Sequence, residues 1–382
     1  YALDQNTTGG ANVAFGSRSL QSNTTASNNA AFGRDALRLN TTGTQNTAVG
    51  AYSADVNTTG SYITAIGTNA LGTNTTGDYN TALGRQALYL NTTGSSNVAV
   101  GHDALGDNTT ASNNTAVGHE SLSKNTTGTR NVAIGAEALD ASVGINDNVA
   151  IGYQAQTSNT GNGATANTGA SNIAIGSYAL KSLNSTSSGD SIQNVAIGAE
   201  AMESSTSAYR NVAIGYRAFE LNQTQNNTVA VGWYALRESV SGGSNTALGH
   251  YTLTRTTTGA SNTAVGNATL QYNTTGSYNT GVGHRALDQA TTADGNTAVG
   301  YQALYLNTTG ASNTAIGVGA LDANTTTNNN TAVGYGALGE NTASNNTALG
   351  NNALAVNTTG TSNASVGYYA LGANTTGTYN TA

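Results

Sequence analysis

Residues 296–310, NTAVGYQALYLNTTG, contain every feature that recurs along this chain. A small residue and an aliphatic residue precede a glycine, Ala-Leu follows shortly after it, and Asn-Thr-Thr-Gly ends the unit. The glycine after the aliphatic residue, here Gly300, is the marker of the repeat. Of the 20 steps between 21 marker glycines, 17 are 17 residues long, and the exceptions are 24, 22 and 16. Such strict periodicity indicates a repeat architecture.

Each position of the unit has its own character. The residue before the marker is always aliphatic or Phe, and the residue three before it is Thr or a small apolar residue. These two share one face of a strand, because side chains alternate along a strand. Together with the Leu four residues after the marker, they are expected to form a thin core of three aliphatic columns. We expect a second short strand at Ala-Leu and a turn at Asn-Thr-Thr-Gly.

A single unit cannot bury its own aliphatic residues, but stacked units can, each pairing in parallel register with the next. The sequence therefore predicts an all-β fold: a parallel β-solenoid, or β-roll, of about 22 coils that runs as one continuous solenoid over residues 1–382. Helices are disfavoured, because Gly and Asn-Thr-Thr interrupt most units and β-branched Thr, Val and Ile are concentrated just before the markers. An Asn four residues before most markers, such as Asn97 and Asn131, can stack from coil to coil.

Residues 153–195 are the irregular part of the repeat. Two coils gain seven and five extra residues, in stretches such as Ser158–Gly169 and Asn184–Ser191. Insertions in solenoids map to loops on one face, which is often the binding face. The alternative interpretation, which is equally compatible with the sequence, is that these insertions are tolerated surface loops without a role.

Composition excludes several function classes. Only 8% of the residues are charged, and the 12 Lys and Arg form no patch, so no nucleic-acid partner is expected. No apolar run approaches the roughly 20 residues of a membrane helix, so we expect no membrane insertion. The absence of Cys excludes a disulfide framework.

The sequence shows no recognisable catalytic chemistry. Nothing resembles a nucleophile with its base or a phosphate-binding loop, so we expect no enzyme, no catalytic residues and no cofactor. All four histidines directly follow a marker glycine, and His102 and His119 fall on adjacent coils that could share a metal. The same position also holds residues as different as Arg34 and Trp233. We therefore interpret it as a variable outward position and predict no metal site.

The residue between the Thr-or-aliphatic position and the aliphatic position of each strand faces the other way, and it is Ala in 19 of 21 units. An exposed face would accept larger residues, so this column indicates the close approach of another surface. That surface is either a neighbouring chain, which predicts an oligomer whose axis runs along the rod, or another wall of the same narrow coil. The candidate axis residues are Ala48, Ala65, Ala82, Ala99, Ala116 and Ala133.

Asn-Thr-Thr recurs as a formal N-glycosylation acceptor on a predicted turn. The alternative is that Asn stabilises the turn and Thr extends a strand edge. Regular Thr columns also raise the possibility of ice binding, although adjacent Thr residues cannot both point outward from a flat strand. The candidate acceptors are Asn6, Asn23, Asn40, Asn57, Asn74, Asn91, Asn108, Asn125, Asn273, Asn307, Asn324, Asn357 and Asn374.

The motif N-x-A-[VI]-G, as in residues 131–135 and 211–215, resembles the head repeats of trimeric autotransporter adhesins. The longer unit, as in Asn296–Thr309, resembles repeats of bacteriophage tail-fibre proteins. This resemblance covers essentially the whole chain. It implies a left-handed β-roll, three chains around one axis, display outside the cell or on a virion surface, and attachment to a receptor or matrix ligand. The repeat here is longer than in the adhesin heads, and no membrane anchor, stalk or cap is present.

The repeat phase at the ends suggests a second mode of self-association. A gap of three residues between Ala382 and a following Tyr1 would restore the phase, which predicts head-to-tail growth into a filament. Three functions therefore remain open at this point. They are an adhesive or tail-fibre segment, a self-assembling and possibly glycosylated structural filament, and an ice-binding protein.

Overall fold

The computed structural model describes residues 1–158, 170–183 and 192–382, and among these residues it contains strands and turns but no helix. There are 21 strands of three residues each. The chain divides into two compact units, Tyr1–Asn194 and Val195–Ala382, which are described separately. The strands of the first unit are β1 (Val13–Phe15), β2 (Ala30–Phe32), β3 (Thr47–Val49), β4 (Thr64–Ile66), β5 (Thr81–Leu83), β6 (Val98–Val100), β7 (Thr115–Val117), β8 (Val132–Ile134), β9 (Val149–Ile151) and β10 (Ile173–Ile175). Those of the second unit are β11 (Val195–Ile197), β12 (Val212–Ile214), β13 (Val229–Val231), β14 (Thr246–Leu248), β15 (Thr263–Val265), β16 (Thr280–Val282), β17 (Thr297–Val299), β18 (Thr314–Ile316), β19 (Thr331–Val333), β20 (Thr347–Leu349) and β21 (Ala364–Val366).

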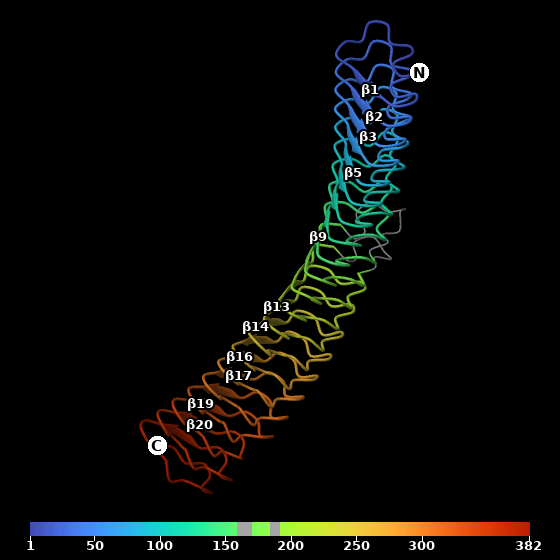
Figure 1. The fold of residues 1–382 in the computed structure, drawn as a ribbon. Helices are drawn as coiled ribbons and strands as arrows, with labels where there is room; N and C mark the ends of the chain where they lie inside the picture. Colours follow the sequence, from blue (N-terminus) through green and yellow to red (C-terminus); the bar gives the residue numbers. More distant parts are fainter. Residues whose placement is uncertain (159–169, 184–191) are drawn as a thin grey trace. The chain divides into compact units, whose positions relative to one another are not determined.

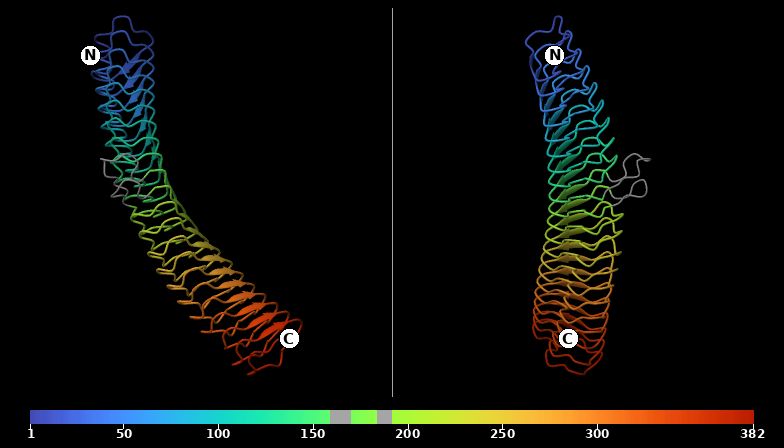
Figure 2. Two further views of the ribbon diagram at one scale, coloured as in Figure 1. Left: turned by 180° about the vertical axis from the view of Figure 1, so that it is seen from behind. Right: turned by 45° about the vertical axis from the view of Figure 1, so that its right-hand side comes forward.

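Within each unit every strand pairs in parallel with the strand of the next coil, so the strands lie one above another (Figure 1). Equivalent repeat positions face each other: Ala82 pairs with Ala99 in the first unit, and Ala298 with Ala315 in the second. The further views show the same stacking from other directions (Figure 2). The predicted parallel β-solenoid with a repeat of 17 residues is confirmed.

Irregular step lengths do not disturb the register. β9 and β10 are separated by the 24-residue step, yet Ala150 pairs with Ala174. The 16-residue step between β19 and β20 likewise leaves Ala332 opposite Ala348. The inserted or missing residues are therefore accommodated between strands. Most of both predicted loops, residues 159–169 and 184–191, lies outside the described residues.

The marker glycine is required by its backbone. Its φ lies between 131° and 142° where it is described at this position, a region that L residues rarely adopt. A Cβ on Gly50 would lie 2.6 Å from the carbonyl oxygen of Gly67 in the next coil. The positive φ of the marker glycine and the close approach of the next coil's backbone thus both exclude a side chain at this position of each internal coil.

The segment after the marker differs from the prediction. Ala-Leu is not a second strand but part of a run of turns. Gln86 and Leu88, two and four residues after Gly84, both have left-handed φ values, 58° and 53°. Leu88 still donates its backbone N–H to Ala104 in the next coil at 3.0 Å. The coil therefore closes through alternating turn conformations while its backbone groups remain paired between coils.

The interior of the coil is built from Ala and Leu. Ala99 in the strand, and Ala104 and Leu105 after it, have no exposed surface. The first and third strand residues point outward instead, and Val49 and Leu83 are 38% and 44% exposed. The expected core of three aliphatic columns is thus wrong for two of them. Only the Leu column lies inside, facing two columns of mainly alanine.

The alanines proposed as an oligomer axis lie inside the single chain. All six are completely buried without any second chain present: Ala48, Ala65, Ala82, Ala99, Ala116 and Ala133. They are small because the opposite wall of their own coil packs against them, which is the second of the two alternatives. They are therefore not a surface on which another chain could pack.

Candidate assembly surface

The outer sheet face consists of the first and third residues of each strand, in β1–β10 of one unit and β11–β21 of the other. Its third position is Val, Ile, Leu or Phe in all 21 strands, and its first position is Thr in 11 of them and otherwise Val, Ile or Ala. No third-position residue is buried: each is half-buried or exposed. The face therefore consists of two parallel columns. One column is a mixture of Thr and apolar residues, and the other is aliphatic or Phe throughout.

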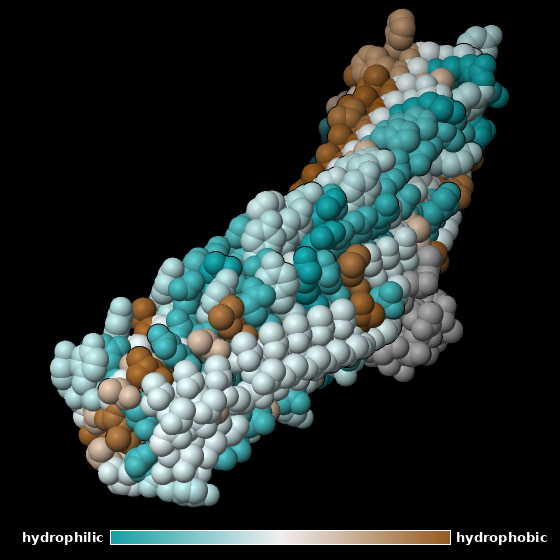
Figure 3. All heavy atoms as spheres, turned by 90° about the horizontal axis from the view of Figure 1, so that it is seen from below, coloured by the Kyte–Doolittle hydropathy of each residue, from teal (hydrophilic) through white to brown (hydrophobic). Residues whose placement is uncertain are grey.

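The outer sheet face carries no charge. Lys, Arg, Asp, Glu and His are absent from both of its positions in every strand. Residues of one hydropathy class line up in rows on the surface, and hydrophobic residues make up one such row (Figure 3). Parallel sheets are usually covered on both faces, and a large exposed apolar patch usually marks an interaction surface.

The position after the marker forms a ridge of larger side chains next to the sheet. In the second unit, Trp233 stacks on Tyr216, Tyr234 and His250, with ring centroids 4.7 to 6.4 Å apart. Arg217 covers Tyr216 at 5.1 Å from the ring centroid. Because neighbouring groups cover the ring faces, this cluster stabilises adjacent coils and does not offer a free stacking platform.

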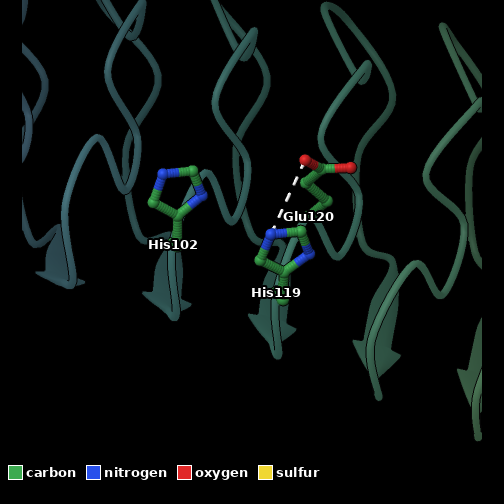
Figure 4. A group of neighbouring side chains, drawn as sticks. All are labelled: His102, His119 and Glu120. Carbon is green, nitrogen blue, oxygen red and sulfur yellow. Dashed lines mark ion pairs between the residues drawn. The ribbon is translucent and has the colours of Figure 1, made fainter.

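Two of the four histidines lie side by side in the first unit. The rings of His102 and His119 are parallel within 9°, with centroids 5.3 Å apart. Glu120 Oε1 lies 3.7 Å from His119 Nε2, as the dashed line shows (Figure 4). His250 and His284 instead stack on Trp233 and Tyr301. Sequence reasoning placed all four histidines at the same outward position but did not find Glu120 as their neighbour.

The Asn of Asn-Thr-Thr faces the interior. Asn40 Nδ2 donates to Asn23 Oδ1 in the preceding coil at 3.0 Å and to the Gly43 carbonyl oxygen at 2.9 Å. Asn57 repeats the pattern against Asn40 and Gly60. Eleven of the 13 candidate acceptors are completely buried: Asn23, Asn40, Asn57, Asn74, Asn91, Asn108, Asn125, Asn273, Asn307, Asn324 and Asn357. Asn6 and Asn374 are half-buried.

This burial conflicts with glycosylation in the folded coil. An N-linked glycan is attached to Nδ2, which is the atom that makes these hydrogen bonds inside the molecule. The eleven buried sites are not accessible to such a group, and their hydrogen bonds support the alternative role of stabilising the turn. The first Thr also has a structural role, since Thr41 Oγ1 donates to the Thr58 carbonyl oxygen at 3.0 Å. The second Thr, such as Thr42, is exposed.

The second Asn column, four residues before the marker, forms the ladder predicted from sequence. Asn114 Oδ1 accepts from the backbone N–H of Asn131 at 2.9 Å, and Asn114 Nδ2 donates to the Gly128 carbonyl oxygen at 2.8 Å. The column is interrupted by Ile63 and Thr228. Both Asn columns therefore satisfy backbone groups that the narrow interior removes from water.

Acidic residues lie along the turns, away from the outer sheet face. Burial raises the pKa of the Asp288 carboxyl, although Arg285, whose Nε donates to it at 2.9 Å, acts in the opposite direction. Burial likewise raises the pKa of Asp55, Asp140 and Asp322. The Arg130 guanidinium hydrogen-bonds Asp147 and lowers the pKa of that carboxyl.

Comparison of the sequence with models of protein families gives no match, and comparison with curated proteins gives none either. Among the described residues there is no helix long and apolar enough to cross a membrane. The β-solenoid fold is compatible with a structural repeat protein, and a more specific role depends on the surface described above.

Proposed function

We propose that this chain is a non-enzymatic structural segment of an extracellular fibre, in which several copies, three in the simplest arrangement, pack through their outer sheet faces. The observation that supports this is that both outward strand positions are uncharged in all 21 strands and that the third position is always aliphatic or Phe. A water-exposed solenoid face gains nothing from a continuous aliphatic column, whereas covering that column removes apolar surface from water.

A second copy of the chain matches this face better than an unrelated partner. Every copy carries the same columns at the same strand spacing of about 4.8 Å, so two faces match in period wherever they are placed in register. Symmetric association of identical surfaces is also the common route to homo-oligomers. Two such faces do not repel each other electrostatically, because neither column contains a charged residue.

The area of the face sets how much of it an interface must use. Ten strands at about 4.8 Å make a strip about 48 Å long in the first unit, and at a width of roughly 10 Å it covers about 480 Å². The eleven strands of the second unit give a strip of about 530 Å² on the same basis. Each strip alone is smaller than the roughly 800 Å² per partner of a standard protein interface, so a stable assembly requires a contribution from the faces of both units. Attachment to a receptor or matrix ligand is the role that the adhesin and tail-fibre resemblance supports for such a fibre.

A charge placed on the outer sheet face tests this proposal. Ile134→Lys puts an ammonium group in the third column, and we expect it to dissociate the assembly while the circular dichroism of the coil is retained. Ala136→Lys, two residues further along and off the face, is the matched control and should leave the assembly intact. Equal assembly of both variants would refute the outer sheet face as the interface.

Ice binding is a second candidate for the same face. Eleven strands begin with an outward Thr, which is half-buried in ten of them, so a Thr column lies on this face. A free face that binds ice requires single chains and gives thermal hysteresis. An assembled face is covered and gives none. Measuring hysteresis on the wild-type chain and on Ile134→Lys therefore separates the two functions.

A further inference from the structure

His102, His119 and Glu120 bring three metal-binding groups together on two adjacent coils of the first unit (Figure 4). One ligand atom from each lies within 4.8 Å of the other two. The backbone holds this arrangement, because the Glu120 N–H donates to the His102 carbonyl oxygen at 2.9 Å. The three side chains are therefore positioned by the pairing between coils as well as by their own rotamers.

The surroundings of His102 define which of its nitrogens is available. Arg85 Nη1 lies 3.0 Å from His102 Nε2, and a guanidinium can only donate, so Nε2 carries the lone pair. The proton then belongs on Nδ1, which makes no hydrogen bond in this structure although Asp103 Oδ2 lies 3.1 Å away. In a metal-bound histidine this N–H usually donates to such a carboxylate. Arg85 is exposed and would have to leave Nε2 for an ion to bind.

We propose that His102, His119 and Glu120 form a surface site for one divalent transition-metal ion of the Zn²⁺ class, with water completing its coordination. Two imidazoles and one carboxylate suit Zn²⁺, Cu²⁺ or Ni²⁺, whereas Ca²⁺ and Mg²⁺ prefer sites made of oxygen ligands. All three side chains are at least partly exposed at the surface, so an ion and its waters can reach them from solvent.

The other group of acidic residues with this spacing does not support a metal site. Glu200 and Glu220 in the second unit accept hydrogen bonds from Arg217 and Arg237, at 2.6 and 2.7 Å. These guanidinium groups neutralise the carboxylates that an ion would need. The histidine site has no comparable neutralisation of Glu120, so it is the stronger candidate.

The chain provides its own controls for a test. Ala occurs naturally at the position of His102 and His119 in other coils, as Ala51 and Ala136, so His→Ala is compatible with the coil. His284 occupies the same position in the second unit but has no histidine on a neighbouring coil. His284→Ala is thus a matched control that removes one imidazole from outside the site.

The experiment is calorimetric titration of the full chain with Zn²⁺, supported by the visible absorption of bound Co²⁺. We expect one site per chain, at least tenfold weaker binding in His102→Ala and His119→Ala, and unchanged binding in His284→Ala. Glu120→Gln should weaken binding several-fold and Arg85→Gln should strengthen it. The proposal is refuted if the wild-type chain binds no Zn²⁺, if all histidine variants bind equally, or if Arg85→Gln binds more weakly.

Discussion

At the scale of single residues, the interior is so narrow that one methyl group matters. Gly281 is the one strand position where glycine replaces the usual central alanine, and the preceding coil has Thr269 where most coils have alanine. A Cβ on Gly281 would lie 2.6 Å from Thr269 Cγ2. Thr269 adopts this rotamer with its Oγ1 donating to the Gly283 carbonyl oxygen at 2.6 Å. The two exceptions therefore compensate for each other.

This compensation predicts a non-additive pair of substitutions. Gly281→Ala should destabilise the chain by about 1–3 kcal/mol through overpacking. The same change in a Thr269→Ala background should cost much less, because the pair then matches the alanines of the other coils. Thermal unfolding of the two single variants and the double variant measures the coupling. Additive losses would show that the two residues do not share this space.

At the scale of the repeat element, strand position, register and the Asn ladder could be predicted from the sequence. They follow from periodicity alone, since in-register stacking aligns equal positions. Which strand face lies inside could not. The alternation of side chains along a strand defines two faces but does not show which of them is buried. Aliphatic residues normally point inward. Here the interior is too narrow to hold both the Leu column and the aliphatic residues that precede the marker, such as Val49. Only alanine therefore fits opposite the Leu column.

The turn that follows the marker glycine could not be predicted from the sequence either. Leu88 adopts a left-handed φ of 53°, a conformation that costs a non-glycine residue about 1–2 kcal/mol. Leu has no intrinsic preference for the left-handed conformation, so its presence does not predict such a turn. It is stabilised by tertiary contacts, because Leu88 is completely buried and its backbone pairs with the next coil. The sequence likewise leaves both interpretations of the alanine column open, an oligomer axis and the opposite wall of the coil, because it does not predict the turns that place this wall.

The Asn ladder gives a prediction at this scale. Asn114→Ala removes the acceptor of the Asn131 N–H and the donor to the Gly128 carbonyl oxygen, both inside the coil. We expect a loss of about 2–5 kcal/mol, since each unpaired buried group costs about 1–3 kcal/mol. Hydrogen exchange should show reduced protection of the Asn131 amide. Thr110→Ala, at an exposed Thr, should change neither quantity; unchanged exchange at Asn131 in Asn114→Ala would contradict the role of the ladder.

At the scale of the whole molecule, the carboxyls predict an unusual response to acid. Burial raises the pKa of Asp55, Asp140, Asp288 and Asp322 above the ordinary 3.8. Such groups bind a proton more tightly in the folded state, so their contribution favours folding at low pH and is lost as pH rises through the folded pKa. Asp147, with its pKa lowered by Arg130, contributes in the opposite direction.

The thermal midpoint should therefore rise as pH is lowered from 7 towards the ordinary Asp pKa. Circular dichroism melts at half-unit pH steps measure this, and a double variant with Asp288→Asn and Asp322→Asn should reduce the rise. A midpoint that falls steadily over the same range would show that other carboxyls, stabilised in their charged form, dominate the response.

The central claim is that the uncharged outer sheet face is covered by further copies of the chain. The most direct test is the native mass of the wild-type particle, measured by native mass spectrometry over a range of protein concentrations. The account predicts a closed multiple of 38.2 kDa, with three chains as the expected number. A single chain at all concentrations, soluble and with the outer sheet face in water, would contradict it.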